Sequence, residues 1–153
     1  MNHEISIRKA ILKDAKIIAK FNRAMAQETE GKRLKETTIN AGVENLFKHP
    51  EYGFYIVAET ENRVVSCLLI TYEWSDWRNG LIWWIQSVYT HPEFRRRGIY
   101  RQMYTYIKTM ALSAKNICGI RLYVEKENTT AQSTYKNLGM KETVYNMYEE
   151  MLC

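Results

Sequence analysis

The sequence predicts a single domain of the α/β (α+β) class, in which helices flank a mixed sheet. The middle of the chain, residues 54–90, is rich in β-branched and aromatic residues, as strands are. The segments on either side carry apolar residues at helical spacing. The chain has 153 residues, 46% of them apolar, which is the size of one ordinary domain with its own core. No repeat or linker divides it, so we expect one domain over residues 1–153.

The first third of the chain is expected to be helical after one short strand. A strand at about 5–8 precedes Asp14, a residue type that caps helices, and apolar residues then recur at helical spacing. The polar segment 29–35 predicts a loop. A second helix from about Thr38 should end before Pro50, because proline cannot continue a helix.

Strands are expected next, over about 54–59, 64–72 and 81–90. Asn79-Gly80 is a strong hairpin signal, because both positions of a type I′ turn require positive φ. The strands on either side of this pair should therefore be antiparallel neighbours.

The helical period returns from Gly98, and alternation over about 120–124 predicts another strand. Asn128 can cap a short helix that Gly139 ends. A last strand is expected over about 141–150. The predicted order, β-α-α-β-β-β-α-β-α-β, includes a strand–helix–strand crossover.

Composition excludes several classes of protein. The longest apolar run, Val64–Tyr72, is interrupted by Ser66 and is far shorter than a membrane helix needs. The N-terminal segment has no continuous apolar stretch of the signal-peptide kind. We therefore expect a cytoplasmic protein with no membrane partner. The three histidines are too dispersed for a zinc site, so no metal is expected.

The positive charge is concentrated in one turn. Lysine and arginine number 22 against 17 acidic residues, for a net charge of +5, which fits an anionic ligand or nucleic acid. Four arginines fall within residues 95–101. A strand is expected to end near His91 and a helix to begin at Gly98. A helix start offers unpaired N–H groups and partial positive charge, so this turn predicts a phosphate site.

The run Arg95-Arg96-Arg97-Gly98-Ile99 resembles the (Q/R)-x-x-G-x-(G/A) signature of the GNAT superfamily of N-acetyltransferases, and residues 88–94 resemble its usual lead-in. One position departs from it: Tyr100 replaces the final small residue. The resemblance implies that this loop binds the pyrophosphate of acetyl-CoA. The cofactor-binding residues implied here are Val88, Tyr89, Thr90, Arg95, Arg96, Arg97, Gly98, Ile99, Tyr100 and Arg101.

A second segment, residues 128–140, is similar to the family's second signature, N-x-x-A-x-x-x-Y-x-x-x-G-(F/M). By this resemblance Asn128 caps the helix and offers an amide to the pantetheine arm of the cofactor. Tyr135 is the implied catalytic acid at the leaving thiolate, because a phenol with a pKa near 10 still carries its proton at neutral pH.

The resemblance also implies a fold and a reaction. The fold is a mixed central sheet of about six to seven strands, flanked by about four helices, with the fourth and fifth strands splayed apart. Backbone N–H groups near Val88 and Tyr89 would meet the thioester oxygen there. The reaction is direct transfer from acetyl-CoA, in a ternary complex and without a metal, to a primary amine of a small molecule or peptide.

The general base is predicted from the hairpin. If Asn79-Gly80 closes a two-residue turn, Glu73 lies opposite Gln86, and one sheet face carries both together with Trp84 and Trp77. Glu73 is therefore the leading catalytic base. Glu28, expected in the loop after the first helix, is the second, because the family shapes its acceptor pocket there. A water chain to solvent is an alternative to either.

Two other functions fit parts of the sequence. A CoA-binding sensor would keep the fold and lose catalysis. A nucleic-acid-binding module would use the charge and the tyrosines, yet no RRM, KH or helix-turn-helix signature is present, so no nucleic-acid partner is expected. The chain has one final strand where the family usually has two, which favours pairing with a second subunit as a homodimer.

Overall fold

The structure is a computed structural model that describes residues 3–153. The chain forms two compact units, residues 1–122 and 123–153, and each is described by itself. The described part of the first unit contains β1 (Ser6–Lys9), α1 (Ala15–Glu30), α2 (Glu36–Lys48), β2 (Gly53–Thr60), β3 (Arg63–Ser75), β4 (Gly80–Thr90), α3 (Ile99–Ser113) and β5 (Ile117–Arg121). The second contains α4 (Thr129–Asn137).

The five strands form one sheet in the order β1-β2-β3-β4-β5. The first three pairings are antiparallel, and β4 and β5 are parallel neighbours joined through α3. This mixed sheet with four helices confirms the predicted class. Within residues 3–153 the strand count is five, below the six to seven expected.

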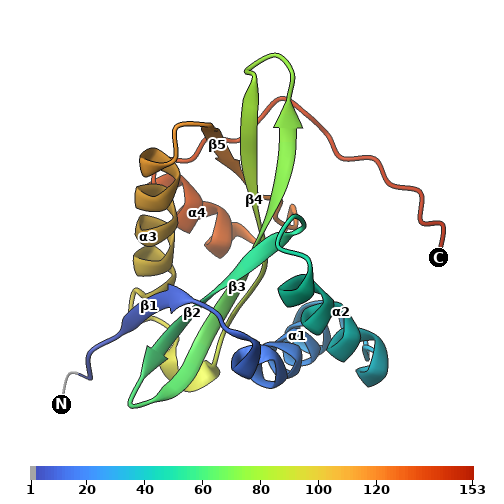
Figure 1. The fold of residues 1–153 in the computed structure, drawn as a ribbon, viewed down its shortest axis with the longest axis vertical. Helices are drawn as coiled ribbons and strands as arrows, with labels where there is room; N and C mark the ends of the chain where they lie inside the picture. The colour runs from blue at the N-terminus through green and yellow to red at the C-terminus, as the bar shows by residue number, and fades with distance from the viewer. Residues whose placement is uncertain (1–2) are drawn as a thin grey trace. The chain divides into compact units, whose positions relative to one another are not determined.

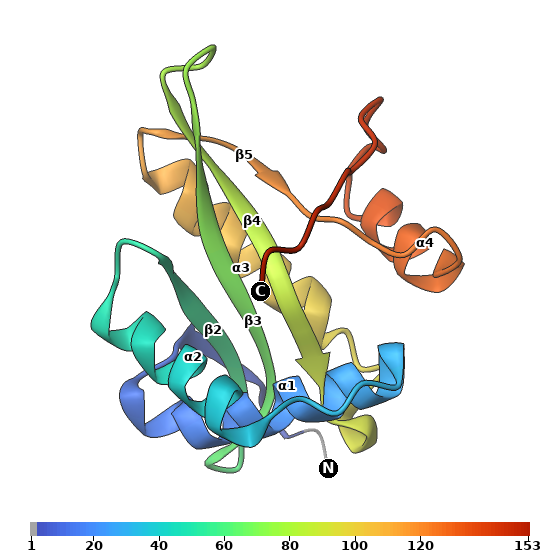
Figure 2. The same cartoon turned by 90° about the vertical axis from the view of Figure 1, so that its right-hand side faces the viewer.

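The helices of the first unit cover both faces of the sheet (Figures 1 and 2). α1 and α2 lie side by side on one face, and α3 lies on the other. Alternating residues of β2 and β3 point to opposite faces of the sheet. Val57 and Cys67 pack with Phe21 of α1 on one face, and Ser66 contacts Met103 of α3 on the other. Burial of Cys67 raises the pKa of its thiol to about 12, so this residue behaves as a small apolar side chain.

Asp14 precedes α1 but does not cap it through its side chain, contrary to the sequence-based expectation. Its carboxylate accepts hydrogen bonds from the Arg8 guanidinium, at 2.8 and 3.0 Å, and from the Ile11 N–H at 2.8 Å. Burial acts to raise the pKa of this carboxyl, but the bonds from Arg8 and Ile11 outweigh burial and hold the pKa below its ordinary value. The start of α1 is thus tied to β1 by charge.

The β3–β4 hairpin corrects the predicted turn. Ser75 pairs with Gly80, so residues 76–79 make a four-residue loop, and Glu73 lies opposite Ile82 rather than Gln86. Glycine at 80 serves close packing: a Cβ there would collide with Cys118 Sγ and with the Asn116 carbonyl at the start of β5. The glycine that suggested a two-residue turn is therefore required by the neighbouring strand.

The expected last strand is also corrected. Residues 141–150, all of which the structure describes, form no strand. Val144, Tyr148 and Leu152 are 92%, 94% and 90% exposed. Local preference for extended backbone predicted a strand, but a strand also needs a neighbour to pair with, and sequence preference does not supply one. Over the described residues, no helix has both the length and the apolar character required to cross a membrane.

Candidate active site

The turn between β4 and α3 presents unpaired main-chain donors. Gly98 lies at the N-cap of α3 with φ of 71°, in the left-handed region, and Arg96 has φ of 62°. The first helical bond runs from the Gln102 N–H to the Gly98 carbonyl at 3.1 Å, so the N–H groups of residues 99–101 have no acceptor within the helix. A Cβ built on Gly98 meets nothing within 4 Å. The space beside Gly98, at the start of the helix, is therefore open.

The arginines of this turn divide into two kinds. Arg95 is engaged: its Nε donates to the Thr90 carbonyl and its Nη2 to Glu28 Oε2, each at 2.8 Å, and its guanidinium lies 5.4 Å from the centre of the Tyr89 ring. Arg97 is exposed and lies over the Phe94 ring at 5.0 Å. Arg95 thus fixes the turn to α1, while the exposed Arg97 is accessible to an anion.

Tyr100, the departure from the family signature, is partly buried in α3. Its ring centre lies 6.4 Å from that of Tyr104, one turn further along the helix. The side chain therefore packs along α3, and a large residue at this position is compatible with open N–H groups at the helix start.

The strand before this turn parts from its neighbour. β5 pairs with β4 only from Leu81 to Trp84, opposite Ile117 to Arg121, whereas β4 continues to Thr90. Among the described residues, the last six of β4 therefore have no partner in β5. The expected splay of the fourth and fifth strands is confirmed.

A β-bulge lies in the parted stretch of β4, where the β3 register shifts and Ser87 has φ of 51°. The His91 N–H donates to Val65 of β3, and the Tyr89 carbonyl accepts from Ser66 of β3. Main-chain groups alternate along a strand, so those of Val88 point toward the open edge. Of the two predicted donors, Val88 faces that edge and Tyr89 faces β3.

Glu73 lies on the same sheet face as α1 and α2, in an uncovered polar row. Its Oε1 accepts from Trp84 Nε1 at 3.0 Å and its Oε2 from Arg121 Nη1 at 2.8 Å. Gln86 Nε2 donates to Thr71 Oγ1 at 2.6 Å next to it. The register error is four residues, an even number, so the prediction that Glu73, Trp84 and Gln86 share a face holds.

Trp77, which was expected on that face, lies in the hairpin loop and is 88% exposed. Sequence reasoning also missed Arg121 as the partner of Glu73. The predicted crossover was a usable signal, because it indicates that a strand containing Arg121 lies beside β4. That strand covers Ile117–Arg121 rather than about 120–124.

Glu28 lies in the last turn of α1, not in the loop after it, because the helix continues to Glu30. It accepts from Tyr89 Oη at 3.4 Å as well as from Arg95. Burial, and then the negative charge of Glu28, raise the pKa of the Tyr89 phenol. The link from Glu28 to Tyr89 and Arg95 joins α1 to the end of β4.

The second unit carries the other predicted site residues. Asn128 caps α4 as expected, with Oδ1 accepting from the Ala131 N–H at 3.1 Å. Gly139, with φ of 95°, follows the end of the helix. Burial raises the pKa of the Tyr135 phenol above its ordinary value, so this residue keeps its proton at neutral pH. The capping predictions are confirmed, and the chemical roles of both residues stay predictions.

Within residues 3–153, no group of three or more His, Cys, Asp or Glu side chains is placed to hold a metal ion.

The mixed sheet parts beside a strand–turn–helix whose first N–H groups have no acceptor within the helix, which is the arrangement that the sequence predicts for an acyltransferase. The family model described as "Acetyltransferase (GNAT) family" matches residues 17–140, most of the chain. This chain belongs to the GNAT family of acetyltransferases.

Solved structures agree with this assignment. A possible acetyltransferase from Clostridium difficile 630 is 48% identical, with a TM-score of 0.91 over 97% of this chain and 98% of that one. A predicted acetyltransferase from Clostridium acetobutylicum, determined with acetyl-CoA, is 21% identical, with a TM-score of 0.78 over 96% of both chains. A ribosomal-protein-alanine N-acetyltransferase from Brucella melitensis biovar Abortus 2308 is 13% identical, with a TM-score of 0.79 over 98% of this chain and 100% of that one. The comparison with curated proteins finds no match.

The different backbone conformations of Gly98 and Gly42 predict opposite effects on stability when each is replaced by alanine. Gly98→Ala should lower the free energy of unfolding by about 1–2 kcal/mol, because a Cβ is disfavoured at positive φ. Gly42→Ala, in the interior of α2 with open space around it, should raise it by about 0.5–1 kcal/mol. Urea unfolding measures both. A stabilising Gly98→Ala would contradict the geometry of the turn.

Proposed function

We propose that this chain, as one catalytic domain of residues 1–153, transfers the acetyl group of acetyl-CoA to a primary amine of a small molecule or peptide in a ternary complex. The observation that supports this most directly is the start of α3. Its unpaired N–H groups follow the end of β4, where β5 no longer pairs with β4. In the reaction the thioester C–S bond breaks and a C–N bond forms. The amine loses a proton, and the thiolate gains one.

The residues of the turn fit the diphosphate of acetyl-CoA. The N–H groups of residues 99–101 and the dipole of α3 would bind its phosphate oxygens. Arg96, Arg97 and Arg101 are exposed and supply positive charge, while Arg95 positions the loop. Open space over Gly98 allows the close approach that this role requires.

The open edge of β4 fits the thioester. The main-chain N–H of Val88 is the proposed donor to the carbonyl oxygen on which negative charge develops. One such donor is worth about 10²–10³-fold in rate. Asn128 uses Oδ1 as the helix cap, which leaves its side-chain N–H groups to bind the pantetheine arm.

Removal of the proton from the amine is assigned to Glu73, with Glu28 as the second candidate. At pH 7 an amine with a pKa of about 10.4 is neutral in only about one molecule in 2,500. Glu73 accepts from the indole N–H of Trp84, which holds a negative charge in place where a cationic amine can be attracted. The incoming amine must displace the bond from Arg121, which makes Arg121 part of this proposal.

We also propose a cytoplasmic location. The three cysteines are free in the structure, which suits a reducing compartment, as does the odd number of them.

Acetyl-CoA should stabilise the protein against heat. At about 100 times its Kd, a ligand that binds only the folded state should raise Tm by roughly 5–10 °C. Arg97→Glu should weaken binding at least tenfold and reduce this shift. Arg63→Glu is the matched control, because Arg63 also lies over the Phe94 ring, at 5.6 Å, but is outside the turn. Equal losses of affinity in the two variants would refute a phosphate site at residues 95–101. If acetyl-CoA did not raise the Tm of the unmodified chain, acetyl-CoA binding would be refuted.

Tyr135→Phe should lower kcat by about 10²–10⁴-fold with little change in the KM for acetyl-CoA, because the variant lacks the proton for the thiolate. The raised pKa gives a sign for the pH profile: the acid is active while protonated, so unmodified kcat should fall only above pH 10. The variant should lack that alkaline limb. A variant with unchanged kcat would remove Tyr135 from the acid role.

We propose that the exposed C-terminal segment pairs with a second copy of the chain. The segment combines strand-forming residues with apolar side chains that are largely exposed, a combination that monomers rarely tolerate. Light scattering should give twice the mass of one chain, and deletion of residues 144–153 should give the mass of a monomer. A monomeric full-length chain at high concentration would contradict this pairing.

A further inference from the structure

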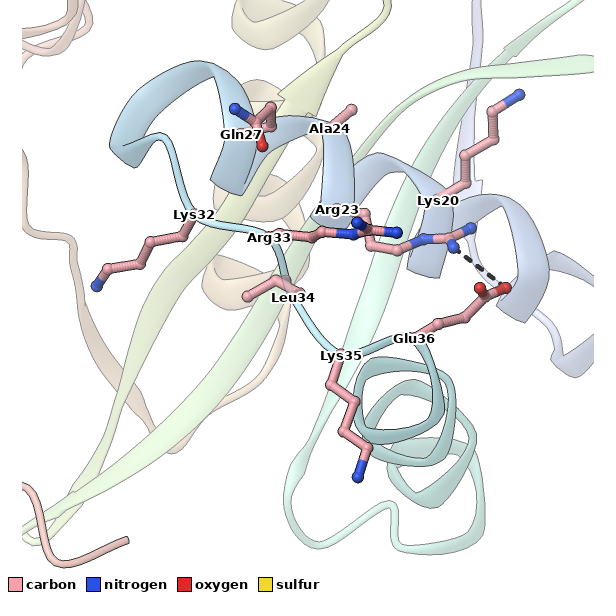
Figure 3. Close-up of a pocket in the computed structure, with 9 residues that line it drawn as sticks. All are labelled: Lys20, Arg23, Ala24, Gln27, Lys32, Arg33, Leu34, Lys35 and Glu36. Atoms are coloured by element: carbon pink, nitrogen blue, oxygen red, sulfur yellow. Dashed lines mark ion pairs between the residues drawn. The ribbon is translucent and has the colours of Figure 1, made fainter.

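An open cavity of about 630 Å³ lies between α1 and the connection to α2 (Figure 3). The cavity is separate from Glu73, Val88 and the turn of residues 95–101, since none of these residues lines it. Its charged side chains are five cations and one carboxylate: Lys20, Arg23, Lys32, Arg33, Lys35 and Glu36.

Ion pairs within the described part of the protein neutralise two of these five cations. Arg23 Nη1 pairs with Glu36 Oε1 at 3.1 Å, and Lys32 Nζ lies 3.4 Å from Glu30. Lys20, Arg33 and Lys35 have no ion pair among the residues that the structure describes. The net charge of the whole chain is only +5, so this cavity concentrates much of the excess on one surface. Such a surface attracts anions.

The cavity wall is held at both ends. Gly31 ends α1 in the left-handed conformation, and the N–H groups of Gly31 and Lys32 donate to Gln27 and Ala26 of α1, each at 3.2 Å. At the other end, the Lys35 carbonyl accepts from the first turn of α2 at 3.1 Å. Lys20 and Arg23 are in α1, and the other three cations are on a segment whose ends are fixed before any ligand binds, which reduces the entropy lost on binding.

The neutral lining indicates which anion fits. Ala24 and Leu34 contribute apolar surface, and Gln27 contributes an amide that can donate to or accept from a peptide bond. Among the nine lining residues there is no aromatic side chain on which a nucleic-acid base could stack. This mixture favours an acidic peptide over RNA.

The cavity also has a link to the proposed reaction. Gln27 lines it, and the next residue, Glu28, contacts Tyr89 and Arg95 at the end of β4. Neither Glu73 nor Val88 lines the cavity, so an acceptor that uses both places must extend beyond the cavity. A peptide is suited to this, since extended chain spans about 3.3 Å per residue.

We infer that the cavity selects the acceptor: the amine to be acetylated belongs to a peptide or protein segment with acidic residues a short distance along the chain. This inference rests on the proposed function and names its substrate class. The cations bind the acidic residues, while the amine reaches the open edge of β4.

The test compares two ten-residue peptides that share a free N-terminal amine and one lysine. One carries four glutamates after the lysine, and the other carries four glutamines. The release of CoA thiol should give a kcat/KM about tenfold higher for the acidic peptide at 50 mM salt, since each exposed ion pair is worth about 1.4- to 5-fold. The advantage should shrink at 0.5 M salt.

A charge-reversed variant, with Lys20→Glu, Arg33→Glu and Lys35→Glu, should lose this advantage but keep the KM for acetyl-CoA. The matched control reverses Lys16, Lys108 and Lys115, which are exposed and outside the cavity. Equal loss in the control, or equal kcat/KM for the two peptides with the unmodified chain, would overturn the inference. The salt dependence of the unmodified chain tests it even if the variant fails to fold.

Binding measurements separate this inference from the proposed function. Fluorescence anisotropy with the labelled acidic peptide should show binding that the charge-reversed variant loses. If the unmodified chain binds the acidic peptide, the variant does not, and no amine is acetylated, then the transferase proposal fails and the anion site is supported. If an RNA of ten uridines displaces the peptide at lower concentration, the cavity is a nucleic-acid site and the peptide inference fails.

Discussion

The site depends on one constraint of main-chain hydrogen bonding. A strand inside a sheet satisfies its N–H and C=O groups on both sides, and an unpaired group that is cut off from water is costly. After Trp84, β4 loses β5 on one side and keeps β3 on the other. The bulge at Ser87 then changes which groups face the parted edge. The Val88 N–H thereby faces the parted edge while β4 stays paired with β3, which is the orientation that the proposed function requires.

The parted edge and the helix start need a rigid connection, and Arg95 provides it. Its guanidinium bonds the last carbonyl of β4 and the carboxylate of Glu28, so strand, turn and α1 are tied at one point. Both side chains are partly exposed, so the direct energetic value of this pair is small. Its effect is geometric: it holds the turn so that Arg96 and Gly98 can keep the left-handed conformations that open the N–H groups.

The sequence predicted features that depend on neighbouring residues, and missed those that depend on distant ones. Asn128 lies at the start of α4 and Gly139 follows its end, as expected, because capping depends on residues that are close in sequence. Gly80 was misread because a glycine is needed there to leave room for Cys118, which is nearly forty residues away in the sequence. Residues 141–150 have a local preference for strand, but a strand also requires a partner edge, which no local pattern encodes. The pairing of Glu73 with Arg121 was missed for the same reason.

Charge alone cannot tell acetyl-CoA from an acidic acceptor, because both are attracted to cations. The first unit separates the two demands by geometry. At the start of α3, arginines surround main-chain N–H groups beside a glycine, which suits compact phosphate oxygens. Along α1, lysines and arginines surround Leu34, Ala24 and Gln27, which suits a chain with carboxylates and a partly apolar backbone. Glu28 follows Gln27 of the cavity lining and pairs with Arg95 of the turn, so one arginine near the start of α3 is neutralised by a carboxylate of α1.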